Sequence, residues 1–186
     1  GAGQAGMQIA SSLRDEGYAG DVTIVGEEAY APYQRPPLSK AYLAGDMDEE
    51  SLEFRNEHFY VENNIGVVTG EQIVHVEFGP DGGIAQGSSG KTYEFDKLAL
   101  TTGADVRRLD VEGVDLDGVL YMRGLDDANE LKARWDGIQN IVVIGGGFIG
   151  LEVAAVACKY NKTVTVVHSR DRLMSRAVGP MVSDFF

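Results

Sequence analysis

The stretch Ile-Val-Val-Ile-Gly-Gly-Gly-Phe-Ile-Gly, residues 141–150, decides the fold that we expect for this chain. A short apolar, β-branched run is typical of a buried parallel strand, and the glycines after it fit the pattern G-x-G-x-x-G. Residues 148–160 are rich in Ala, Val and Leu and predict a helix, and residues 163–167 predict the next strand. This order predicts a βαβ unit whose glycine turn and helix N-terminus can bind a pyrophosphate.

A second copy of the glycine pattern, Gly-Ala-Gly-Gln-Ala-Gly, occupies residues 1–6. Residues 4–16 predict a helix that Gly17 ends, and residues 22–25 predict a strand. The strand that should precede the first turn is not in the chain, so we expect a truncated N-terminus. Two such turns in one chain suggest two dinucleotides held side by side, so that one can pass electrons to the other.

The expected fold class is α/β, with two Rossmann-like dinucleotide-binding units. Residues 67–100 alternate between strand patterns and glycine-rich turns, which predicts a β-meander inserted in the first unit. Residues 98–104 predict a further strand that runs into a tight turn. We expect an FAD-binding domain over residues 1–112 and an NAD(P)-binding domain over residues 113–186. A doubly wound domain needs more strands than the second unit has, so the C-terminus also looks truncated.

A proline-rich loop occupies residues 29–45, within the first expected domain. Pro37 can open a short helix at its first position, and a stiff backbone suits a loop that holds Arg35 and Lys40 in place. Residues 54–64 and 126–135 predict two further helices, the second with acids at its start and bases near its end.

The composition is that of a globular protein, with 186 residues, 44% hydrophobic and 24% charged. A formal net charge of −13 argues against nucleic acid and anionic membranes as partners. No run approaches the roughly 18 apolar residues of a membrane span, and we expect a cytoplasmic protein. The single cysteine, Cys158, excludes an internal redox disulfide and is expected to be a small core residue.

The residue that recognises the adenosine ribose is expected about 20 positions after the last glycine of each turn. Glu27 occupies that place in the first unit, where its carboxylate can accept hydrogen bonds from ribose hydroxyls. In the second unit the place holds His168, followed closely by Arg170. An arginine there can accept the 2′-phosphate of NADP, or it can be a solvated loop charge, so the sequence leaves NADH and NADPH open.

Several motifs resemble those of the FAD-dependent, NAD(P)H-linked ferredoxin reductases of the putidaredoxin reductase and rubredoxin reductase type. The motifs are Pro-Tyr-Gln-Arg-Pro-Pro-Leu-Ser-Lys at 32–40, Val-Ile-Gly-Gly-Gly-Phe-Ile-Gly-Leu-Glu-Val-Ala at 143–154, Thr-Thr-Gly at 101–103 and Tyr-Met-Arg at 121–123. The resemblance covers essentially the whole chain. His168 departs from it, because most of these enzymes have an acid at that position.

The resemblance also implies roles for individual residues. Lys40 and Glu152 would pair beside the flavin N5 as the catalytic residues. Glu152 alone can also be explained as an acid in the first turn of a helix, where the helix dipole favours a negative charge without any partner. The FAD-binding residues would be Gly1, Gly3, Ala5, Gly6, Glu27, Arg35, Lys40, Ile73, Thr102, Gly103 and Arg123. The nicotinamide dinucleotide would meet Gly145, Gly147, Phe148, Ile149, Gly150, His168 and Arg170.

The expected function is therefore that of a flavoprotein oxidoreductase. It would transfer a hydride from NAD(P)H to FAD and then pass single electrons to a ferredoxin-type iron–sulfur protein. Two alternatives stay open at this point. One is a flavoprotein reductase with another acceptor, such as oxygen, a quinone or nitrite. The other is a non-catalytic nucleotide-binding module.

Overall fold

Two short parallel strands, β1 (Val22–Val25) and β2 (Ile65–Val68), form the first sheet of the computed structural model, which describes residues 1–186. The chain divides into two units, residues 1–34 with 52–104 and residues 35–51 with 105–186, and each is described by itself. The structure is mixed α/β, as the sequence predicts.

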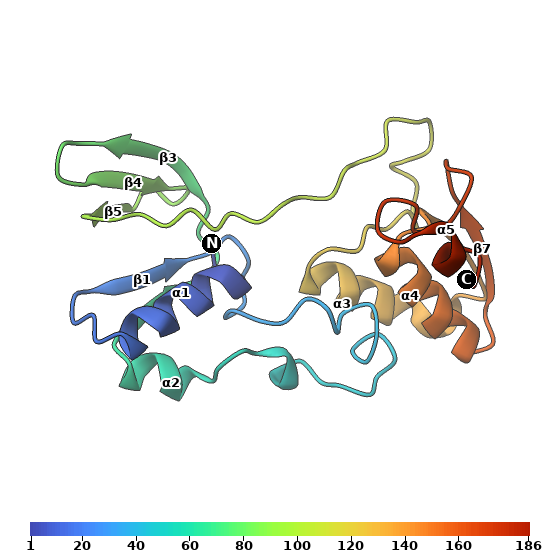
Figure 1. Cartoon of the computed structure of the whole chain (residues 1–186), viewed down its shortest axis with the longest axis horizontal. Helices are drawn as coiled ribbons and strands as arrows, with labels where there is room; N and C mark the ends of the chain where they lie inside the picture. Colours follow the sequence, from blue (N-terminus) through green and yellow to red (C-terminus); the bar gives the residue numbers. More distant parts are fainter. The chain divides into compact units, whose positions relative to one another are not determined.

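In the first unit, helix α1 (Gln4–Asp15) lies against β1, and helix α2 (Glu57–Glu62) packs against β2 (Figure 1). The helix α1 turns an apolar stripe toward the sheet because its apolar residues recur at helical spacing. The core between these elements consists of Met7, Ala10, Ile24, Tyr60 and Ile65, all of them buried.

Helix α2 is shorter than the expected helix over residues 54–64. The side chain of Asn56 caps it by accepting a hydrogen bond from the Phe59 amide, at 3.1 Å, so the helix cannot extend toward residue 54. At the other end Asn64 takes a left-handed conformation with φ of 49°, which stops the helix.

Three antiparallel strands, β3 (Ile73–Phe78), β4 (Gly83–Gly87) and β5 (Thr92–Phe95), form a second sheet in this unit. The buried carboxylate of Glu71 ties the β4–β5 turn to the start of β3. It accepts hydrogen bonds from the Ser89 hydroxyl at 2.5 Å, the Ser89 amide at 2.9 Å and the Ser88 hydroxyl at 3.2 Å.

The strand predicted over residues 98–104 is wrong. The chain there is irregular, because no neighbouring strand of the described chain completes a ladder of hydrogen bonds with it. Thr101 instead meets the first glycine turn, where its hydroxyl donates to the Gly1 carbonyl at 3.0 Å.

The second unit contains the parallel pair β6 (Asn140–Ile144) and β7 (Thr163–Val167), joined by helix α4 (Phe148–Lys159). Helix α4 packs against both strands, as Figure 1 shows. The core of this unit consists of Leu43, Trp135, Val153 and Ala157. The remaining elements are α3 (Leu125–Arg134), the 3-10 turn η2 (Trp135–Gly137) and α5 (Pro180–Ser183); a further 3-10 turn, η1 (Glu50–Leu52), ends the proline-rich segment.

The segment 35–51 belongs to the second unit by its contacts. The short helix predicted from Pro37 is wrong: residues 36–46 form consecutive turns whose hydrogen bonds span three, four or five residues, so no regular ladder develops. Tyr42 ties the segment to α3 by donating to the Asn129 side chain, and the Tyr160 hydroxyl donates to the Ala44 carbonyl.

Cys158 is exposed, so its prediction as a core residue is wrong. It follows Ala157 directly on α4, and the two side chains point in different directions around the helix; Ala157 takes the buried position. No helix of the structure has the length and apolar character needed to cross a membrane.

Candidate functional site

The first glycine turn, residues 1–6, combines two tightly packed glycines with one that faces open space. A Cβ on Gly1 would lie 2.0 Å from the Thr101 carbonyl oxygen, and a Cβ on Gly6 would lie 2.0 Å from the Gly1 carbonyl oxygen. Both positions therefore need glycine for the fold itself. A Cβ on Gly3 would meet nothing within 4 Å, so the fold gives no reason for a glycine there.

The second glycine turn, residues 145–150, repeats this arrangement. Gly145 has φ of 117°, where other residues are strained, and a Cβ on Gly150 would lie 2.2 Å from the Gly145 carbonyl oxygen. Gly147 again faces open space, because a Cβ on it would also meet nothing within 4 Å. In both turns the middle glycine of the pattern is the one that the fold does not require.

Both turns end in a helix N-terminus without a side-chain cap. Gly3 is the N-cap of α1 and Gly147 that of α4, and neither helix receives a side-chain hydrogen bond there. The first amide groups of a helix need an acceptor, and the helix dipole favours a negative one. The open space at Gly3 and Gly147 lets a bulky anion approach these amides. The two turns thus fit a pyrophosphate group, as in a dinucleotide.

In the first unit the other predicted cofactor residues surround the turn only in part. Glu27 lies two residues after the end of β1 and is exposed. Its neighbour Glu28 accepts a hydrogen bond from the Tyr33 hydroxyl at 2.5 Å. Ile73 opens strand β3, and Gly103 has φ of 71°, so the Thr-Gly segment after residue 100 turns sharply. The structure does not test their roles.

In the second unit the loop and helix α4 bring Lys40 and Glu152 together. The Lys40 Nζ lies 2.9 Å from the Glu152 Oε1, and it also donates to the Pro36 carbonyl at 3.1 Å. The side chains are 50% and 25% exposed, so the pair lies at the surface of the unit. The lysine approaches from a stiff proline loop at the surface, where water can still reach it.

Ser39 completes this cluster, although the sequence pattern assigned it no role. Its buried hydroxyl donates to the Glu152 Oε2 at 2.6 Å, so each oxygen of the carboxylate has its own partner. Such two-point binding fixes the plane of the carboxylate. The signal for Ser39 was its place directly before Lys40 in the quoted motif, but a small hydroxyl in a loop has many other uses.

Arg35 and Arg123 also meet in this unit. The Arg35 guanidinium donates to the Arg123 carbonyl at 3.2 Å, which links the proline loop to the start of α3. The amides of Arg123 and Gly124 both donate to the Asp127 side chain at 2.7 Å, which fixes the backbone before the helix.

His168 lies at the end of β7 and turns toward the second glycine turn. The Gly146 amide donates to its Nδ1 at 3.1 Å, and its Nε2 lies 3.0 Å from the Arg172 carbonyl oxygen. Arg170 is exposed in the loop that follows. Both are in the expected segment, and their contacts with a ribose stay a prediction.

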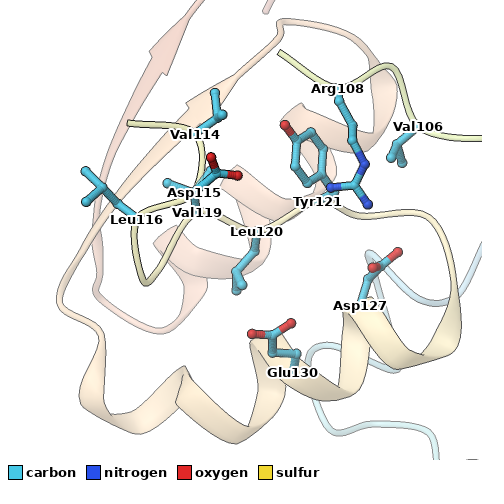
Figure 2. A pocket seen from close by; sticks show the side chains of 10 residues that line it. All are labelled: Val106, Arg108, Val114, Asp115, Leu116, Val119, Leu120, Tyr121, Asp127 and Glu130. Carbon is cyan, nitrogen blue, oxygen red and sulfur yellow. The ribbon is translucent and has the colours of Figure 1, made fainter. Parts of the chain in front are cut away.

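A cavity of about 310 Å³ lies in the second unit and is lined by none of the predicted site residues. In it the Arg108 guanidinium stacks over the Tyr121 ring at 5.1 Å, as Figure 2 shows, and the Asp127 carboxylate is already bound to backbone amides. We therefore assign the cavity no ligand. Its lining consists of Val106, Arg108, Val114, Asp115, Leu116, Val119, Leu120, Tyr121, Asp127 and Glu130.

Comparison with known proteins decides the family. Residues 1–186 match the family described as pyridine nucleotide-disulphide oxidoreductase. The chain belongs to this family. The resemblance inferred from the sequence is thereby confirmed. Within the family, the chain is 42% identical over 184 residues to rubredoxin-NAD(+) reductase of Ectopseudomonas oleovorans, and 44% identical over 186 residues to rhodocoxin reductase of Rhodococcus erythropolis.

The chain spans less than half of these family members: 47% of the rubredoxin-NAD(+) reductase and 43% of the rhodocoxin reductase, with 99% and 100% of the chain covered. Solved structures of the family agree with this. The ferredoxin reductase for the CYP199A2 system from Rhodopseudomonas palustris has a TM-score of 0.94 and 42% identity, covering 100% of the chain and 45% of that structure. The reductase in a covalent putidaredoxin reductase–putidaredoxin complex has a TM-score of 0.89 and 38% identity, with the same coverage.

Proposed function

We propose that the chain is the dinucleotide-binding part of an NAD(P)H-dependent, FAD-containing ferredoxin reductase. The observation that carries this proposal is the repeated glycine turn in which the middle glycine, Gly3 or Gly147, faces open space and is not required by the fold itself. One turn alone would support a nucleotide-binding module. Two such turns, together with the ion pair between Lys40 and Glu152, support electron transfer between two bound dinucleotides.

The proposed fold assignment follows from the same residues. A Rossmann-like FAD domain that contains the first turn would span residues 1–112, with the antiparallel sheet β3–β5 as its insertion. An NAD(P) domain that contains the second turn would span residues 113–186. The cytoplasmic location also stays a prediction.

FAD, when bound, would supply the chemistry by accepting a hydride from NAD(P)H and releasing electrons one at a time. The chain's own residues would bind and orient the two cofactors. The amides at the N-termini of α1 and α4 would hold the pyrophosphates. Glu27 would accept hydrogen bonds from a ribose, and Arg35 and Arg123 would neutralise phosphate or flavin charge.

Lys40 and Glu152 would act where hydride passes from the nicotinamide. A cation placed at the reacting end of the flavin favours the negative charge that reduction brings there. Glu152 holds Lys40 in place through the 2.9 Å ion pair, and Ser39 holds Glu152. The half-exposed position of Lys40 is compatible with this role, because a bound cofactor would remove water from its surroundings.

As electron acceptor we propose a ferredoxin-type iron–sulfur protein. The support lies in the names of the relatives, which are reductases of rubredoxin, rhodocoxin, putidaredoxin and ferredoxin and agree with the motifs of this chain. The net charge of −13 implies that an acidic acceptor would need a local basic surface for docking.

The test uses the purified protein as its gene encodes it. We expect flavin absorbance, bleaching of that absorbance by NADH or NADPH under anaerobic conditions, and NAD(P)H-dependent reduction of an added ferredoxin. Gly3→Ala should abolish flavin retention, because the added methyl group takes the space of a phosphate. For the same reason Gly147→Ala should weaken the binding of the nicotinamide nucleotide by more than about tenfold. Stripped of bound cofactor, both variants should melt as the wild-type apoprotein does.

Two results would contradict the proposal. A protein that binds no flavin, even after incubation with FAD, would leave only a nucleotide-binding module. A protein whose flavin is reduced by NAD(P)H but passes electrons to oxygen or a quinone and not to any ferredoxin would have a different acceptor.

A further inference from the structure

The His168 side chain is bound through both of its ring nitrogens. Its Nδ1 accepts from the Gly146 amide at 3.1 Å, so Nδ1 carries no proton. The hydrogen of the neutral ring then sits on Nε2, which donates to the Arg172 carbonyl at 3.0 Å. These two contacts select one tautomer of a neutral imidazole.

Gly146 is the backbone partner in this arrangement, and it is held from both sides. Its amide binds His168, and its carbonyl accepts from the Met174 amide at 2.7 Å. A Cβ on Gly146 would lie 2.5 Å from the Leu173 Cδ2 and 3.1 Å from the His168 Cγ. A side chain here would press on Leu173 and on the His168 ring, so glycine lets the segment after β7 lie directly against the turn.

The contacts of Gly146 matter for nucleotide binding because of where this residue lies. It directly precedes Gly147, the uncapped N-cap of α4, whose open side fits a pyrophosphate. The direction of the amides at this helix start depends on the backbone of the turn. A side chain that fixes Gly146 therefore fixes the amides that a dinucleotide would meet.

A residue that recognises the ribose needs a polar atom that is free to bind it. Neither ring nitrogen of His168 is free, since both bind the chain's own backbone. Arg170, exposed two residues later, is the group on this segment that can meet a 2′-phosphate.

We propose that His168 is a positioning residue of the nicotinamide dinucleotide site, which sets the shape of the second glycine turn and does not itself recognise the ribose. The inference rests on the proposed function, since it presumes that this turn binds NAD(P)H. It follows that His168 supports the binding of NADH and of NADPH equally, although it occupies the place of the ribose-binding acid.

The experiment measures dissociation constants of NADH and NADPH for the fully reduced flavoprotein, whose flavin can no longer accept their hydride, with three variants. His168→Ala removes both contacts and should raise both constants by the same factor, about tenfold, the range for a donor left without its partner. His168→Asn places an oxygen where Nδ1 was and should restore both constants to within about threefold of the wild type. His75→Asn, at an exposed histidine of β3, is the matched control and should change neither.

A second measurement reports on the contact without any nucleotide. Nitrogen NMR of the labelled protein should show an unprotonated Nδ1 and a protonated Nε2 for the His168 ring. The opposite tautomer would overturn the geometry on which the proposal rests.

The outcomes separate this inference from the proposed function. If the wild type binds neither NADH nor NADPH, the proposed function fails, and the positioning role fails with it. If the wild type binds and His168→Ala binds equally well, only the positioning role fails. If His168→Ala or His168→Asn changes the ratio of the two constants by more than about tenfold, His168 recognises the ribose and the inference is overturned.

Discussion

Lys40 Nζ lies 2.9 Å from Glu152 Oε1, although the two residues come from distant parts of the chain. An ion pair as exposed as this one contributes little to stability, because water screens both charges. Its place between a stiff proline loop and the second turn of α4 points to another use. In the proposed function, the pair holds the Lys40 ammonium group at a fixed position, where its charge acts on the bound cofactor.

A double-mutant cycle on this pair should show that the two residues act as a unit. We expect Lys40→Met to slow flavin reduction by NAD(P)H while FAD still binds, and Glu152→Ala to slow it as well. The double variant should be no slower than the slower single variant, with a coupling of about 0.5–3 kcal/mol. Stopped-flow flavin absorbance measures the rates.

The matched control for that cycle is the exposed pair Lys159 and Asp46, 3.3 Å apart in the same unit. Lys159→Met should leave the reduction rate unchanged. Strictly additive effects at Lys40 and Glu152, or a wild-type rate in Lys40→Met, would show that the pair has no joint role.

Ser39→Ala should act on the reaction through Glu152. The variant leaves Glu152 Oε2 without its 2.6 Å donor, so the carboxylate can rotate and Lys40 loses its fixed position. We expect flavin reduction to slow about fivefold, the equivalent of one hydrogen bond of about 1 kcal/mol. Ser39→Thr keeps the hydroxyl and should recover most of the rate. Equal rates in Ser39→Ala and wild type would remove Ser39 from the mechanism.

Glu27→Ala should weaken FAD binding by about 1–3 kcal/mol, the cost of an unmade hydrogen bond to a charged partner. Glu27 is exposed at the end of β1, so the loss should appear in ligand affinity and not in the melting of the apoprotein. Asp21→Ala, an exposed acid at the other end of the same strand, is the control. Flavin fluorescence titration measures both, and unchanged affinity in Glu27→Ala would transfer the role to Glu28 or water.

Acid should destabilise the first unit through Glu71. Hydrogen bonds from Ser89, and then from Ser88 and Tyr93, lower the pKa of the Glu71 carboxyl below its ordinary value of 4.5. A carboxyl whose pKa is depressed by folding contributes stability above its unfolded pKa and loses it as the pH falls through the folded pKa.

The measurement is the melting temperature of wild type and Glu71→Gln between neutral and acidic pH. Glu71→Gln should melt lower at neutral pH, because the amide binds its four donors less well than a carboxylate does. The difference between the two proteins should shrink on acidification below the ordinary pKa. A difference that grows in acid would mean that the Glu71 pKa is raised by folding.

The choice between NADH and NADPH should depend on Arg170. We expect mixed or NADPH-leaning use, and Arg170→Ala should raise the KM for NADPH about tenfold while that for NADH stays within about twofold. Steady-state kinetics with each nucleotide decides this. A wild-type preference for NADH above about tenfold in kcat/KM would contradict the prediction.

The sequence alone determined the local elements whose signals are short-range. The β-branched run before Gly145, the glycines themselves and the alanine-rich stretch after them predicted β6, the turn and α4 nearly to the residue. Glycine patterns depend on backbone conformation and close approach, both of which a few neighbouring residues fix. The motifs quoted from the sequence, such as those at residues 32–40 and 143–154, pointed to the family in the same way.

Tertiary structure decided what depends on partners distant in the chain. Residues 98–104 have strand character yet form no strand, since a ladder needs a neighbour. The spacing made His168 a candidate ribose ligand, but the fold turns its Nδ1 to the Gly146 amide of the distant glycine turn and its Nε2 to the nearby Arg172 carbonyl. Ser39 gained its role only when α4 placed Glu152 against it. Side-chain hydrogen bonds across long loops are set by packing, which local patterns do not encode.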